Sequence, residues 1–97
     1  MNITLNIDGK EKTFSAPFVK ARILKNYLKL LKDNNLDDIR DPDTLDKIID
    51  LLVDAYSGQF TVDEVWDGIE SKKLIKTLLK FISDITGNSE ESDDEGK

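Results

Sequence analysis

The stretch DPDTLDKIIDLLVDAYSG, residues 41–58, predicts a helix with both of its ends marked. Asp41 can accept hydrogen bonds from the free amides at the helix start, and Pro42 has the fixed φ that suits a first helical residue. Gly58 can supply the left-handed cap at the helix end. Apolar residues recur at helical spacing and predict one buried side, made of Leu45, Ile48, Ile49, Leu52, Val53 and Tyr56.

The outer side of this helix carries aspartates, whose mutual repulsion costs a few tenths of a kcal/mol per pair unless a basic surface faces them. A last helix is expected from about Ser71 to Thr86, with Gly87 as its cap and lysines on its outer side. We expect the two charged rows to mediate self-association, and the alternative of ordinary solvated helix faces stays open. The rows are Asp43, Asp46, Asp50 and Asp54, and Lys72, Lys73, Lys76 and Lys80. The last helix is expected to bury Leu74, Ile75, Leu78, Leu79, Phe81, Ile82 and Ile85.

Between these helices, Thr61-Val62-Asp63-Glu64 has the pattern of a capping box and predicts a short helix through Ile69. Phe60 precedes the cap and is expected to staple its entry. Trp66 lies on this short helix, where a tryptophan is either part of the core or an anchor for a partner.

Toward the N-terminus, Ile3, Leu5 and Ile7 alternate with polar residues, Asp8-Gly9 predicts a tight turn, and the alternation resumes over residues 12–16. Two strands alone are marginally stable, so the hairpin must pack on the helices. The fold class is therefore α+β, mainly α, with an N-terminal hairpin and about four helices. We expect one domain over residues 1–86 and a disordered acidic tail over residues 87–97, which contain five acids and no apolar side chain.

The first helix is expected to start at Pro17 and to run to about Asp33. Its apolar residues cover an arc of about 200°, twice the width that packing on one core requires. They are Val19, Ala21, Ile23, Leu24, Tyr27, Leu28, Leu30 and Leu31. The helix is therefore covered on two sides or keeps apolar surface for a partner. We predict partner contact by Val19, Ile23, Tyr27, Leu30, Phe60 and Trp66.

The composition argues against catalysis, because the chain has neither His nor Cys and its five glycines form no phosphate-binding loop. We expect no enzyme activity, no cofactor and no metal. The longest apolar run is three residues, so no membrane span is expected. A net charge of -6, with an acidic middle between two basic segments, argues against nucleic-acid binding. The absence of Cys suits a reducing, intracellular compartment.

Three segments carry a resemblance to a known family: IDGKEKTF in the hairpin, APFVKARIL at the first helix, and QFTVDEVWDGIESKKLI from residue 59. Over residues 1–86 the chain resembles the tail assembly chaperones of long-tailed bacteriophages that infect Gram-positive bacteria. The resemblance implies a protein of the host cytoplasm that binds the tape-measure protein, helps to recruit tail-tube subunits and is absent from the mature virion. It also implies several copies along the client, and therefore a homo-oligomer.

Many such chaperones also exist as a longer product, made when ribosomes slip near the end of the short reading frame. The resemblance implies that residues 87–97 would then form a linker to a second domain, and Glu95-Gly96-Lys97 is compatible with a slippery stretch of codons. Two other functions stay open: an acidic inhibitor or DNA mimic that acts on a host protein, and a minor structural subunit retained in the tail.

Overall fold

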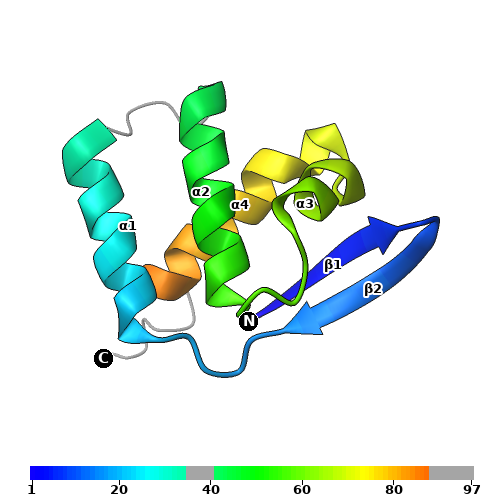
Figure 1. Ribbon diagram of the computed structural model, residues 1–97, viewed down its shortest axis with the longest axis horizontal. Helices are drawn as coiled ribbons and strands as arrows, with labels where there is room; N and C mark the ends of the chain where they lie inside the picture. The colour runs from blue at the N-terminus through cyan, green and yellow to red at the C-terminus, as the bar shows by residue number, and fades with distance from the viewer. Residues whose placement is uncertain (35–40, 88–97) are drawn as a thin grey trace.

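The computed structural model describes residues 1–34 and 41–87 as a two-stranded sheet and four helices (Figure 1). Helices α1 and α2 stand side by side, α4 crosses behind them, and α3 lies next to the hairpin. The predicted fold class is confirmed. The predicted tail lies outside the described residues, apart from Gly87. The elements are β1 (Asn2–Ile7), β2 (Lys10–Ser15), α1 (Ala21–Asn34), α2 (Pro42–Ala55), α3 (Val62–Gly68) and α4 (Ser71–Thr86).

The hairpin has the predicted turn, since Asp8 and Gly9 both have positive φ, 55° and 82°. The strands are antiparallel, with Ile7 opposite Lys10 and Thr4 opposite Thr13. The Thr4 and Thr13 hydroxyls lie 2.9 Å apart and form a hydrogen bond on the exposed face. On the other face, Ile3 and Leu5 of β1 are buried and Phe14 of β2 is half-buried, and β1 packs on α3.

Helix α2 is the centre of the core, with seven buried residues. Its start is as predicted, because the Asp41 carboxylate accepts a hydrogen bond from the Thr44 amide at 3.2 Å and Pro42 is the first helical residue. The helix ends before Gly58, the residue that was predicted to cap it. The helix stops at Ala55, and Ser57 and Gly58 follow with φ of 58° and 72°.

Helix α3 begins with the predicted capping box. The Glu64 amide donates to the Thr61 hydroxyl at 3.1 Å, and the Thr61 amide donates to the Glu64 carboxylate at 2.9 Å. The last residue of α3, Gly68, lies against β1: a Cβ added there would come within 3.0 Å of the Asn6 carbonyl oxygen. Because no larger residue fits without a shift, this glycine sets how closely α3 approaches the sheet.

Helix α4 ends as predicted at Gly87, which is left-handed with φ of 75°. One predicted core residue of this helix is wrong: Leu79 is 52% exposed, whereas Leu78 and Phe81 are buried. The apolar arc of α4 is wider than the surface that its neighbours cover.

Helix α1 begins four residues later than predicted, at Ala21 instead of Pro17. Ala16 is still held to the N-terminus, since its amide donates to the Met1 carbonyl at 2.8 Å. The chain therefore continues the edge of the hairpin before it turns, and the first helical-type bond runs from the Ile23 amide to the Lys20 carbonyl at 2.9 Å. Phe18, in this connection, is 80% exposed.

Candidate partner-binding surface

Helix α1 has a covered and an uncovered apolar side. Ile23 is buried in the core, and Tyr27 and Leu30 are half-buried against it. Val19, in the connection before α1, is also half-buried. These four predicted partner-contact residues thus face their own protein body, which leaves little of their surface for a second protein.

The less covered side consists of Ala21, Leu24, Leu28 and Leu31, which we call the α1 strip; Leu24 is half-buried and the other three are exposed. Leu28 is 51% exposed and Leu31 is 37% exposed. At about 100° per residue, the strip spans about 80° of the helix circumference next to the covered side. The expectation that α1 keeps surplus apolar surface is therefore met by the described structure.

Lysines border the α1 strip on the side away from the core. Lys25, Lys29 and Lys32 line one shallow groove together with Leu24 and Leu28, and this groove has a volume of about 400 Å³. The surface is thus apolar along its centre and positively charged along one edge. It can receive an apolar helix that carries acidic residues beside its apolar stripe.

The other two predicted contact residues differ in exposure. Phe60 is buried, with its ring centroid 5.0 Å from that of Phe14 and 5.2 Å from that of Tyr56. Trp66 is 36% exposed on α3. Of the six residues predicted for partner contact, Trp66 keeps the most open side chain.

The four aspartates of α2 and the four lysines of α4 are all exposed. Three of the four lysines already have acidic neighbours within the chain: Lys73 and Lys72 lie 3.2 and 3.9 Å from the Glu70 carboxylate, and Lys80 lies 3.9 Å from Asp84. On the acidic side, Asp50 and Asp54 line a shallow groove of about 240 Å³ that Lys29 of α1 also lines. Part of the basic surface that the aspartates need is therefore supplied by the same chain.

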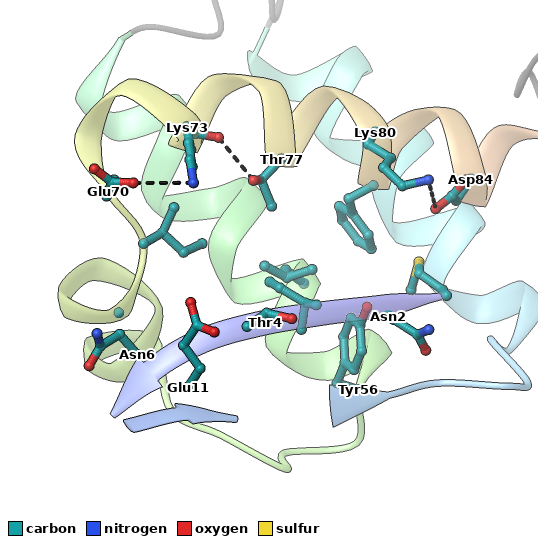
Figure 2. Close-up of a pocket in the computed structure, with 16 residues that line it drawn as sticks. Asn2, Thr4, Asn6, Glu11, Tyr56, Glu70, Lys73, Thr77, Lys80 and Asp84 are labelled. Carbon is teal, nitrogen blue, oxygen red and sulfur yellow. Dashed lines mark hydrogen bonds and ion pairs between the residues drawn. The ribbon is translucent and has the colours of Figure 1, made fainter. Parts of the chain in front are cut away.

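A second groove lies between β1 and α4 and has a volume of about 460 Å³ (Figure 2). Asn2 and Thr4 of β1 line one side, and Lys73 and Lys80 of α4 line the other. Tyr56 also lines the groove, and burial together with the nearby negative charge of Asp84 raises its pKa to about 12. Its hydroxyl is thus protonated at neutral pH.

Sequence reasoning did not find this second groove, since its walls come from segments far apart in the chain. It did place Leu24, Leu28 and Leu31 in the apolar arc of the first helix. The four residues of that arc that it named for partner contact, however, lie on its covered part: Val19, Ile23, Tyr27 and Leu30. The positions of Lys25, Lys29 and Lys32 were the signal that could have identified the uncovered part. Lysines mark the solvent-facing side of a helix, so the apolar residues beside them on the helix surface lie farthest from the core.

A small body with a hairpin, four helices and an apolar strip beside lysines suits the class of small helical proteins that bind another protein through an apolar surface. The comparison with known families agrees with this class: the model of a family described as phage tail chaperone protein matches residues 1–97. The chain belongs to this family, and membership implies a non-enzymatic role in phage tail assembly. No curated protein and no solved structure matches the chain. None of the described helices is long and apolar enough to cross a membrane.

Proposed function

We propose that the protein is a chaperone that binds the tape-measure protein during tail assembly, and that the α1 strip is its contact surface. The observation that carries this proposal is the exposure of Leu28 and Leu31 beside a lysine border. A long helical client exposes apolar stripes until the tail tube covers them. An apolar strip with one charged edge can shield such a stripe and fix its orientation.

Each single contact is weak. Full burial of a leucine is worth about 1.5–3 kcal/mol, and Leu28 and Leu31 retain only 51% and 37% of their exposure. The gain from covering both is therefore about 2 kcal/mol before the costs of association. Stable shielding then requires several copies on one client. When the bound copies are linked to one another, the overall affinity rises without a new kind of contact.

We therefore also propose that copies associate along the client through the aspartate row of α2 and the lysine row of α4. Contacts between two different surfaces are head-to-tail and give rings or open spirals. The exposed lysines of α1 and α4 interrupt the negative surface that a DNA mimic requires, so this alternative has less support than the chaperone.

Further parts of the proposal concern the cell and the virion. The protein acts in the cytoplasm of a Gram-positive host, recruits tail-tube subunits through a longer frameshifted product, and is absent from the finished particle. The codons for Glu95-Gly96-Lys97 and the reading frame downstream test the frameshift. Detection of the protein in purified virions would instead support a structural subunit.

The function itself is tested by co-expression with the tape-measure protein of the same phage. The wild-type chain should keep the tape-measure protein in the soluble fraction, and the double variant Leu28→Lys with Leu31→Lys should not. Leu79→Lys is the matched control, because Leu79 is as exposed as Leu28 but lies on α4. A tape-measure protein that is equally soluble with both variants would remove the α1 strip from the proposal, and one that aggregates even with the wild type would remove the function.

A further inference from the structure

The outer edge of β1 is not paired with another strand in the described structure, and its half at Asn2 and Thr4 borders a groove. β1 pairs only with β2. The Ala16 amide donates to the Met1 carbonyl, and the odd-numbered residues of β1 follow this ladder in register with β2. Because backbone groups alternate along an antiparallel strand, the amides and carbonyls of Asn2 and Thr4 point to the opposite edge. They have no hydrogen-bond partner among residues 1–34 and 41–87.

This open edge borders the groove between β1 and α4. Figure 2 shows Asn2 and Thr4 along β1 and Lys73, Thr77 and Lys80 along α4, on the other side of the groove. The far end is closed, because Gly68 of α3 lies against the backbone of Asn6. The accessible edge is therefore the half of β1 that contains Asn2 and Thr4.

A buried hydroxyl in the groove gives a second, independent observation. Tyr56 is only 1% exposed, yet its hydroxyl makes no hydrogen bond to any described residue. Buried hydroxyls nearly always have a partner in protein or ordered water, so an unpaired one that lines a groove marks a point where a polar group can bind. In Figure 2 the Tyr56 hydroxyl is directed toward β1 and the groove.

We propose that the groove between β1 and α4 binds an extended segment of a partner protein, which adds to the open edge of β1 as a third strand. Its backbone pairs with the backbone of Asn2 and Thr4, and a polar group of the segment forms a hydrogen bond with the Tyr56 hydroxyl. Alternate side chains of the segment face the floor of the groove, which includes Leu52, Ile69 and Phe81, so they are apolar. This surface is distinct from the α1 strip.

Charge and space argue against the chain's own C-terminal segment and a second copy, and favour a different protein as the occupant. The groove contains the carboxylates of Glu11, Glu70 and Asp84, and its two lysines already lie beside Glu70 and Asp84. It therefore does not attract residues 88–97, which carry five acids and one lysine. A volume of about 460 Å³ holds a single short strand, whereas β1 of a second copy would bring β2 and α3 with it.

The test titrates the ¹⁵N-labelled chain of 97 residues with the uncharged peptide acetyl-Thr-Val-Thr-Val-Thr-amide. The amide signals of the chain are followed by NMR. The amide signals of Asn2 and Thr4 should shift in a saturable way and should become protected from hydrogen exchange. The same peptide with proline at its central position should bind about five- to tenfold more weakly, because it lacks a donor for the ladder.

Two protein variants form a matched pair. Thr4→Pro removes an amide from the open edge, and Thr13→Pro removes the equivalent amide from the outer edge of β2, where the groove does not lie. Both variants lose the same hydrogen bond between threonine hydroxyls. Thr4→Pro should weaken peptide binding about five- to tenfold, and Thr13→Pro should not. Tyr56→Phe, which leaves the backbone unchanged, should also weaken binding, about threefold or more.

Equal affinity of the peptide for the wild type, Thr4→Pro and Tyr56→Phe would overturn the proposal. If Thr4→Pro does not fold, the proline peptide and Tyr56→Phe decide the question alone. Shifts of Asn2 and Thr4 that depend on protein concentration without peptide would assign the edge to a second copy. Shifts of residues 88–97 on peptide addition would assign it to the chain's own C-terminal segment. Either result would contradict a separate partner.

Discussion

Gly68 of α3 and Asn6 of β1 are in direct backbone contact, with room for no side chain between them. A Cβ on Gly68 would lie 3.0 Å from the Asn6 carbonyl oxygen and 3.3 Å from its amide nitrogen. This contact holds α3 against the hairpin and closes one end of the groove between β1 and α4. The two-stranded sheet, which could not stand alone, gains its support here.

Substitution of Gly68 should therefore destabilise the protein. Gly68→Ala should lower the free energy of unfolding by about 1 kcal/mol and Gly68→Val by about 3 kcal/mol, since the added atoms force the helix away from the strand. Urea unfolding followed by circular dichroism measures both changes. Asp67→Ala, at the exposed neighbouring position, should change stability by less than about 0.5 kcal/mol. Alanine and valine tolerated as well as glycine would mean that the contact is not tight.

Ile23 and Leu28 form a second pair of comparable size and opposite environment. Ile23 is 6% exposed and Leu28 is 51% exposed on the same helix. Ile23→Ala should destabilise by about 2–4 kcal/mol, because it leaves a cavity in the core, and Leu28→Ala by less than about 1 kcal/mol. Midpoints of urea unfolding give both values. Equal losses would show that the two sides of α1 are covered to the same extent.

The different environments of Ile23 and Leu28 also show which features of the fold could be predicted from the sequence. Local signals gave correct helix starts at Asp41-Pro42 and Thr61-Glu64, because a capping side chain acts within one turn. The breadth of the apolar arc on the first helix was predicted too. Which part of that arc is covered depends on where α2 and α4 pack, and this is not a local property. The same reason explains why Leu79 was expected in the core and why the open edge of β1 was missed.

Stability should fall above pH 10 through Tyr56. In the unfolded chain this phenol ionises near its ordinary pKa of 10.0, whereas in the folded chain its pKa is raised to about 12 by burial and by Asp84. The folded state thus retains the proton that the unfolded state loses. The contribution is complete below pH 10 and is lost between pH 10 and about 12, with a total of about 3 kcal/mol.

The measurement is urea unfolding of the wild type and of Tyr56→Phe from pH 9 to pH 11. The phenylalanine variant has no such proton, so lysine and other tyrosine effects cancel in the difference. The wild type should lose stability more steeply than the variant. Parallel curves would show that the Tyr56 phenol titrates normally in the folded state.

Neutralising the aspartates of α2 should weaken self-association without lowering the stability of the monomer. The variant with Asp43, Asp46, Asp50 and Asp54 all changed to Asn should be a smaller species in analytical ultracentrifugation if the row binds the lysines of another copy. Its monomer should be slightly more stable, by a few tenths of a kcal/mol for each repulsive pair removed.

The matched control neutralises four other carboxylates, on the hairpin and on α3: Asp8→Asn, Glu11→Gln, Asp63→Asn and Asp67→Asn. It changes the net charge by the same amount and should leave the oligomer unchanged. Loss of association in both variants would assign the effect to net charge alone. An unchanged size in the α2 variant would leave the row as an ordinary solvated face.

The most direct test of the central claim is the affinity of the chain for a helical segment of its tape-measure protein, measured by fluorescence anisotropy of the labelled segment. Leu28→Lys with Leu31→Lys should weaken binding by roughly 30-fold, equivalent to about 2 kcal/mol, while Leu79→Lys should bind like the wild type. Equal affinity of the wild type and both variants would show that the uncovered apolar side of α1 does not bind the client.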